Sequence, residues 1–181
     1  AYEVSLGLVG LEMCIRDRVF IVPHEEVNGK WQGAVCEIPM PAFATGIMRG
    51  RFGSDGSLYT CGMFAWAGNA TSPGGFHRIR RGAQPAQVPL AVHATKETMS
   101  VTFSDPITDM KSSIKVWSLK RTKNYGSKHH DEHELTIRSV KLSGDKKTIT
   151  LGILDLAPTQ CYELKINDRV LHGTIHQLSN P

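Results

Sequence analysis

The sequence lacks a long apolar run. Nowhere in its 181 residues do about 20 apolar side chains follow one another, the length that crosses a bilayer as a helix. We therefore expect no membrane span in this chain. Hydrophobic residues nevertheless make up 40% of the sequence, which is enough for a packed core in one domain or in two small ones.

The motifs that mark common catalytic and metal sites are also missing. The sequence has no Gly-x-Ser-x-Gly elbow, no Gly-rich phosphate loop and no His-Glu-x-x-His pair, so no pattern supports nucleophilic catalysis. It has no Cys-x-x-Cys either, which excludes a zinc ribbon and a covalently attached haem from this sequence. We expect no catalytic and no cofactor-binding residue here.

Cysteine and net charge are both low. A Cys36–Cys61 disulfide is conceivable in an exported protein, but free thiols buried on strands are the favoured interpretation of Cys36, Cys61 and Cys161. The formal net charge is only +4, and the basic residues at 78–81 and 120–123 are too sparse for a nucleic-acid surface. We expect solvated strand edges or loops there and no nucleic-acid partner.

Helix signals are scarce, apart from one turn at 107–113, and short β-type runs dominate. The first runs cover 45–52, 58–63 and 75–80, with an Asp55-Gly56 turn between the first two. We interpret residues 19–82 as a terminal β-propeller blade, with Trp31 and Trp66 packed inside it. Because propeller blades bury one another and this pattern occurs once, we expect the chain to be the tail of a larger protein whose upstream blades are its partners.

The second half of the sequence predicts an antiparallel sandwich. Residues 83–89 contain two prolines and form a linker, and residues 90–181 then alternate apolar and polar side chains with a period of two. Seven strands are expected in this region, at 90–95, 98–104, 113–119, 134–142, 147–154, 160–167 and 173–178. The predicted fold class is therefore all-β, with a partial β-propeller blade followed by an Ig-like antiparallel β-sandwich.

The first 18 residues differ in character from the rest. The stretch Met13-Cys-Ile-Arg-Asp-Arg18 resembles translated sequencing-adapter DNA, which occurs at the broken ends of reading frames assembled from environmental samples. We therefore expect residues 1–18 to be a non-native artefact. The alternative is that residues 4–11 form a short strand or a degenerate signal-peptide core.

Several blocks of sequence carry a family resemblance. Residues 100–106, 140–151 and 156–164 resemble the strand pattern of bacterial Ig-like domains. Five blocks together resemble the C-terminal region of large secreted bacterial proteins: the hairpin ending in Trp66, the strands at 78–80 and 103–106, residues 116–129 and the ending at 173–176. Those proteins join a glucose/sorbosone-dehydrogenase-like β-propeller to a c-type cytochrome domain. The resemblance implies a parent that uses pyrroloquinoline quinone (PQQ) and haem c, with the residues for that chemistry lying upstream.

Two clusters are candidate binding sites. His129, His130 and His133 are the densest group of metal-ligand side chains, although a polar loop between strands is the favoured interpretation. Trp117, Asn124 and Tyr125 form a candidate sugar-binding face. The interpretation favoured for Trp117 is instead the buried core tryptophan of a sandwich strand.

The sequence therefore predicts a non-catalytic C-terminal module of an exported, dehydrogenase-like and haem-c-linked propeller protein, located in the periplasm or secreted. Its role would be structural, or that of an interaction module. The alternative hypothesis is a carbohydrate-binding β-sandwich that recognises polysaccharide through Trp117.

Overall fold

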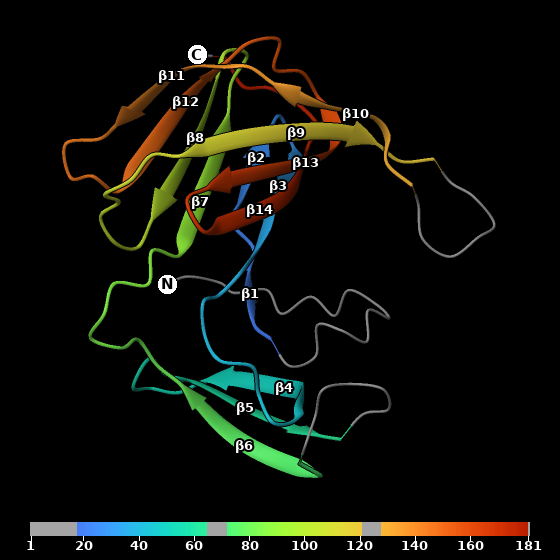
Figure 1. Ribbon diagram of the computed structural model, residues 1–181. Helices are drawn as coiled ribbons and strands as arrows, with labels where there is room; N and C mark the ends of the chain where they lie inside the picture. The colour runs from blue at the N-terminus through green and yellow to red at the C-terminus, as the bar shows by residue number, and fades with distance from the viewer. Residues whose placement is uncertain (1–17, 65–71, 121–127, 181) are drawn as a thin grey trace. The chain divides into compact units, whose positions relative to one another are not determined.

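The computed structural model describes residues 18–64, 72–120 and 128–180, and in this part of the chain the protein is all-β (Figure 1). All strand pairs with a defined register are antiparallel, and they form sheets of seven, four and three strands. The predicted fold class is confirmed at this level. The helical turn expected at 107–113 is wrong, because residues 107–111 are irregular and the strand β9 begins at Ser112.

The chain divides into two compact units. The small unit consists of Ala1–Phe20 and Ile38–Ala86, and the large unit consists of Ile21–Glu37 and Gln87–Pro181. The segment Ile21–Glu37, which the sequence analysis placed in the blade, thus belongs to the large unit. The reason is its pairing: strand β3 (Lys30–Glu37) lies beside β14 (Arg169–Ile175), with Ala34 opposite Gly173.

The small unit contains a three-stranded sheet in the order β4 (Gly46–Phe52), β5 (Leu58–Met63) and β6 (Gly74–Ile79). The turn between β4 and β5 is tied by Asp55, whose carboxylate accepts hydrogen bonds from the Ser57 backbone N–H at 3.0 Å and from the Arg78 guanidinium at 2.7 Å. Gly56 has a φ of 75°, a conformation that glycine adopts without strain. These local features explain why the Asp-Gly sequence makes a hairpin here.

The large unit contains the other two sheets. The seven-stranded sheet has the order β1-β3-β14-β13-β9-β10, with β2 also paired to β3, and the four-stranded sheet has the order β11-β12-β8-β7. Besides β3 and β14, the strands are β1 (Phe20–Ile21), β2 (His24–Val27), β7 (Pro89–Ala94), β8 (Thr98–Phe103), β9 (Ser112–Ser118), β10 (His130–Leu135), β11 (Ile137–Leu142), β12 (Thr148–Ile153) and β13 (Thr159–Ile166).

One hydrophobic core joins the two sheets of the large unit. Val101 and Leu151 on the four-stranded sheet, and Leu164 and Leu171 on the seven-stranded sheet, are all fully buried members of it. Every second residue of β8, β12 and β13 points into this core, as the alternating sequence predicts. Burial from two sides is what holds this unit together.

One expected strand divides in two. Residues 134–142 were predicted as a single strand, but the chain passes at Thr136 from β10, which pairs with β9, to β11, which pairs with β12. The strand thus changes sheets. Leu135 and Ile137, on either side of Thr136, are both packed against the core, so the apolar pattern continues through the crossing.

Candidate functional site

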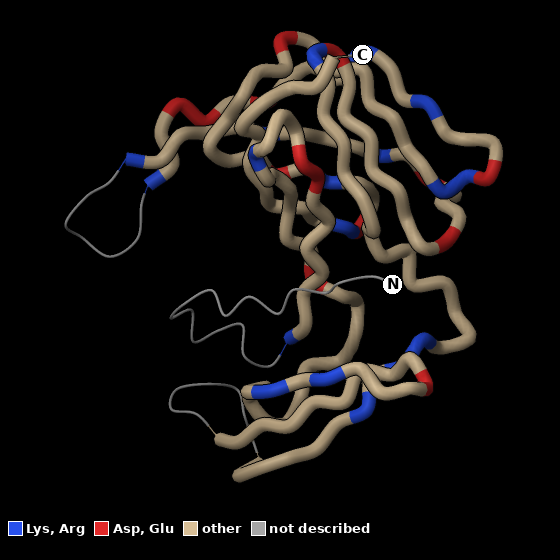
Figure 2. The backbone as a smooth tube through the Cα atoms, turned by 180° about the vertical axis from the view of Figure 1, so that it is seen from behind, with Lys and Arg blue, Asp and Glu red and all other residues tan. Residues whose placement is uncertain are grey.

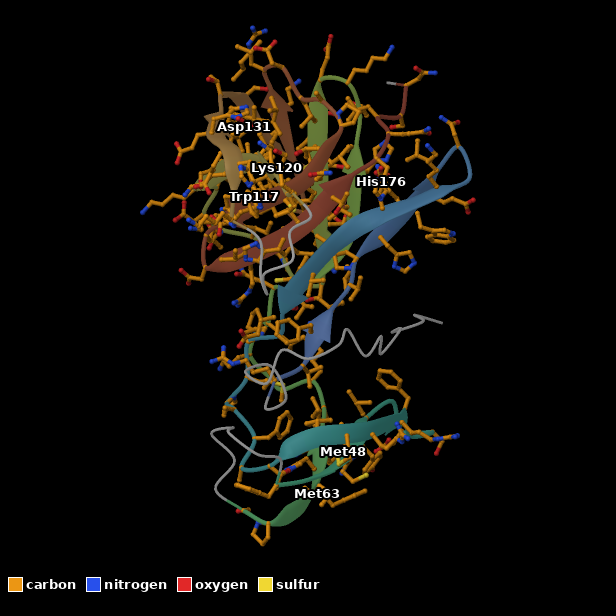
Figure 3. All side chains as sticks on the ribbon, turned by 90° about the vertical axis from the view of Figure 1, so that its right-hand side faces the viewer. Met48, Met63, Trp117, Lys120, Asp131 and His176 are labelled. Atoms are coloured by element: carbon orange, nitrogen blue, oxygen red, sulfur yellow. The ribbon has the colours of Figure 1, made fainter. Side chains whose placement is uncertain are left out.

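Trp117 lies on the outer side of the seven-stranded sheet, at the end of β9. Its neighbours Ile114 and Val116 are buried, whereas Trp117 is only partly buried. The interpretation of Trp117 as a core tryptophan is therefore wrong. The alternation along β9 explains this position, because Val116 faces the core and the next side chain must face the other way. Figure 3 labels Trp117 together with Lys120 and Asp131 in this region.

His129 stacks on the indole of Trp117. The two ring centroids are 4.2 Å apart and the ring planes differ by 17°. His129 Nδ1 also contacts the carboxylate of Glu132, and the other oxygen of that carboxylate lies 3.6 Å from Lys115 Nζ. The hydrogen bond with His129 is the main reason that the pKa of Glu132 is lowered. The result is a stacked ring pair bordered by one acid and one base.

The other two candidate ligands lie on strand β10 rather than in a loop. The expectation of a polar loop is wrong for His130 and His133, because both pair with β9 across an irregularity at Asp131, which has a φ of 57°. His133 Nδ1 is 2.8 Å from the Asp131 carbonyl oxygen. Within the described ranges, no three His, Cys, Asp or Glu side chains gather as a metal-binding group. Asn124 and Tyr125 lie outside the described residues, as does Trp66.

The three-stranded sheet of the small unit has one face of mixed apolar and basic character, which we call the open face. The strand registers place seven side chains on it: Arg49, Arg51, Tyr59, Cys61, Met63, Phe76 and Arg78. Phe76 is 72% exposed and stacks on Tyr59 with centroids 5.9 Å apart, and the Arg78 guanidinium lies over the Tyr59 ring. Figure 2 shows basic positions along this sheet, and Figure 3 shows Met48 and Met63 on its strands.

The opposite face of the same sheet is partly covered by residues 38–45. The Thr45 hydroxyl is 3.0 Å from His77 Nε2, and the His77 ring packs on Phe43. The strand registers place Leu58 and Thr60 on the same face as His77, and both are buried. The sheet therefore has a covered side and an open side.

A third group of polar side chains, which sequence reasoning missed, lies in the large unit between β2, β7 and the residues after β14. The Glu25 carboxylate is 2.5 Å from His93 Nδ1, and His93 Nε2 is 3.1 Å from Ser179 Oγ. These residues are 68 and 86 positions apart and form no local motif, so no sequence signal could have joined them.

Glu25 is held firmly in this group. Its second carboxylate oxygen accepts hydrogen bonds from Gln32 Nε2 at 2.7 Å and from the Ala94 backbone N–H at 3.1 Å. Gln32 is itself buried, and its Oε1 accepts hydrogen bonds from the backbone N–H groups of His176 and Gln177. The group thus connects β2, β3 and β7 to the last residues of the chain.

The three cysteines of the described part of the chain are free thiols. Cys36 is buried in the core of the large unit, and burial raises its pKa. Cys61 is exposed on the open face, whereas Cys161 is partly buried and burial raises its pKa as well. The expectation that the thiols are buried on strands is therefore confirmed for Cys36 and wrong for Cys61.

Comparison with known protein families, with curated proteins and with solved structures finds no match to this chain. In the described residues, no helix is long and apolar enough to cross a membrane.

Proposed function

We propose that this chain is a structural and interaction module of an exported β-propeller protein of the glucose/sorbosone-dehydrogenase-like, haem-c-linked kind. In this role the three-stranded sheet is a propeller blade, and its open face packs on the neighbouring blade of the parent. The redox chemistry, with PQQ and haem c, belongs to other parts of that parent. The module contributes packing and contacts in the periplasm or outside the cell.

The observation that carries this proposal is the exposure of apolar side chains on the small unit. Met63 is 53% exposed and Phe76 is 72% exposed on the open face, and Phe52 and Phe64 are each 54% exposed elsewhere on the small unit. Exposed aromatic side chains beside Met and Arg, as on the open face, are typical of protein interfaces. A second sheet laid on the open face would cover these rings as propeller blades cover one another.

We also propose that the large unit is an Ig-like sandwich, and its strand order supports this. In an Ig sandwich one sheet has the order A-B-E-D and the other has the order C-F-G, extended by C′ in some members. If β7 is taken as strand A and the following strands in turn, the two sheets are A-B-E-D and C′-C-F-G. Strand β3 then extends the second sheet beyond strand G.

The test begins with the source DNA, sequenced upstream of Val19 through the complete reading frame. We expect further copies of the hairpin pattern and a Cys-x-x-Cys-His motif. In the complete protein, amides of β4–β6 should exchange with solvent at least about tenfold more slowly than in this chain. Phe76→Asp should remove this gain, and Val140→Asp on the large unit should not. A frame that begins near Val19 without further blades would contradict the proposal.

The partial exposure of Trp117 favours a second candidate function, in which the sandwich binds polysaccharide. Sugar rings stack on aromatic faces, and the Trp117–His129 pair is flanked by Lys115 and Glu132, which can donate and accept hydrogen bonds.

A glycan array with the whole chain tests this candidate. Binding should be lost in Trp117→Ala and kept in Trp31→Ala, a control tryptophan that is 60% exposed on β3 of the same sheet. Equal binding by both variants would remove the hypothesis.

A further inference from the structure

We propose that Ser179 is a nucleophile that accepts acyl groups from carboxylic esters, with His93 as its general base and Glu25 orienting the His93 ring. The proposal goes beyond the structural role given above and concerns a different part of the protein. Serine, histidine and a carboxylate in hydrogen-bonded series form the arrangement by which many unrelated folds activate a hydroxyl group.

The first step in the argument is the tautomer of His93. A carboxylate only accepts hydrogen bonds, so the 2.5 Å contact with Glu25 Oε2 places a proton on His93 Nδ1. In the neutral ring Nε2 is then an acceptor, and it faces Ser179 Oγ at 3.1 Å. The imidazole is thus oriented to take a proton from the serine hydroxyl.

The second step is the rigidity of the carboxylate. Glu25 receives hydrogen bonds from Gln32 and from the Ala94 backbone, and its side chain is 13% exposed. A carboxylate fixed in this way orients the ring and stabilises the imidazolium that forms during the reaction. Glu25 is therefore a positioning residue, and it acts through His93.

The third step is access. The His93 side chain is 51% exposed and Ser179 is partly exposed, so a substrate can reach the hydroxyl from solvent. Ser179 Oγ also lies 3.0 Å from the Ala94 carbonyl oxygen, and its one proton is donated to either Ala94 or His93. The Ser179 backbone N–H donates to the same carbonyl oxygen at 3.0 Å, which fixes the residue beside β7.

The hollow beside Glu25 and His93, lined also by Val92, Met99 and Tyr162, has a volume of about 10 Å³, close to the space of one water molecule, and Ser179 is not part of its lining. This hollow therefore does not hold the acyl group. The substrate class is a carboxylic ester that approaches the partly exposed hydroxyl of Ser179 from solvent.

The reaction balances without a cofactor. Ser179 Oγ attacks the ester carbonyl carbon while its proton passes to His93 Nε2, and the imidazolium returns that proton to the departing alcohol oxygen as the C–O bond breaks. Water then attacks the acyl group on Ser179 and gives its proton to His93. The bond between Ser179 Oγ and the acyl carbon then breaks, His93 returns the proton to Oγ, and the carboxylic acid leaves.

The test is labelling of the whole chain with a fluorophosphonate, which forms an Oγ–P bond and releases fluoride. Peptide mapping by mass spectrometry should place the adduct on Ser179. The labelling rate should fall roughly 100-fold in His93→Gln, and it should fall in Glu25→Gln at least about tenfold, with the fold checked by circular dichroism.

Ser143→Ala is the matched control, because Ser143 Oγ donates to Asp145 and accepts from the Thr148 backbone N–H, and no hydrogen bond to a histidine is among its contacts in the described residues. Its labelling rate should equal that of the unchanged protein, and release of p-nitrophenol from p-nitrophenyl acetate should follow the same order among the variants. Two results would overturn the proposal: no adduct on Ser179 of the unchanged protein, or an adduct that forms equally fast in His93→Gln. Either result would mean that Glu25, His93 and Ser179 only connect β2, β7 and the residues after β14.

Discussion

The small and large units are both antiparallel β-sheet, but they differ in what covers the strands. The large unit buries Leu151, Leu164 and Leu171 completely between two sheets. In its described residues the small unit has a single sheet of three strands, and Phe76 and Met63 are more than half exposed on its open face. Regular hydrogen bonding is therefore present in both units, while a closed core is present in the large one.

The difference indicates which forces specify each unit. Two packed sheets gain stability from apolar burial, at about 25 cal/mol per Å². A lone sheet with one open face depends more on its turn, its ladder hydrogen bonds and the segment that covers the other face, because three strands are about the smallest sheet that can be stable on its own. We infer that the small unit is completed by a partner surface, and the large unit is not in need of one.

The largest expected effect comes from truncating the two cores. Leu164→Ala should lower the free energy of unfolding of the large unit by about 3–5 kcal/mol, because removing a fully buried leucine side chain leaves a cavity between the two packed sheets. Leu58→Ala in the small unit should cost less, about 2 kcal/mol, because Leu58 is buried outside the large core cluster, where the surroundings can close more easily around the smaller side chain. Unfolding by urea, monitored by hydrogen exchange in each unit, measures both changes in the free energy of unfolding. Equal losses would mean that the small unit has a closed core of its own.

Thiol reactivity makes the same comparison without destabilising either unit. Cys61 on the open face should react with a maleimide at the rate of an exposed thiol. Cys36 in the core should react at least about 100-fold more slowly, because its thiol is reached only when the large unit opens. Burial also raises the pKa of Cys36, which lowers the thiolate fraction further. Mass spectrometry of the labelled peptides gives both rates. Rapid labelling of Cys36 would contradict the assignment of β3 to the core.

Many of the strands are predictable from sequence because their signals are local, although β2 and β3 were not among the expected strands. The Asp55-Gly56 turn and the period-two pattern of β8, β12 and β13 depend on adjacent residues, and each matches the structure within one or two positions. The apolar positions of Ile114 and Val116 also predict that Trp117 faces outward, although burial in the core was the favoured interpretation.

The long-range pairings could not be predicted in this way. Strand β3 meets β14 with Cys36 opposite Leu171, and nothing within either strand specifies that partner. No glycine or proline marks the crossing at Thr136. Both sheets accept the same apolar alternation, so the sequence pattern does not show where the chain changes sheets. The Glu25–His93–Ser179 group depends on these pairings, so it became visible only in three dimensions.

A smaller effect is expected when the charge at the hairpin turn is removed by acid. Hydrogen bonds from the Ser57 backbone and side chain, from the Tyr59 hydroxyl and from Arg78 lower the pKa of Asp55 from 3.8 to about 2. Because the folded pKa is the lower one, the carboxylate stabilises the small unit above about pH 4, and this stabilisation is lost as the pH falls through about 2.

The protection of β4 and β5 against hydrogen exchange, measured relative to the intrinsic exchange rate at each pH, should therefore fall over this acid range, while the protection of β12 and β13 changes less. Asp55→Asn provides the control, because its exchange in the small unit should already be fast and should respond less to acid. If acid leaves the β4–β5 hairpin of the unchanged protein as protected as before, the Asp55 contacts do not stabilise the turn.

The smallest change in stability is expected on the open face. Phe76→Ser should alter the free energy of unfolding by no more than about 0.5 kcal/mol, since the ring is 72% exposed. The same substitution should reduce binding of the dye ANS, which marks exposed apolar surface. Val140→Ser on the large unit serves as the comparison. A loss of several kcal/mol in Phe76→Ser would show that the ring is already buried by a neighbour.

The most direct measurement is amide hydrogen exchange of the whole chain, resolved to individual strands. The account predicts that β8, β12 and β13 exchange only through global opening of the large unit, while β4, β5 and β6 exchange at least about 100-fold faster. Equal protection of the two groups of strands in a monomeric protein would contradict the claim that the small unit is completed by a partner.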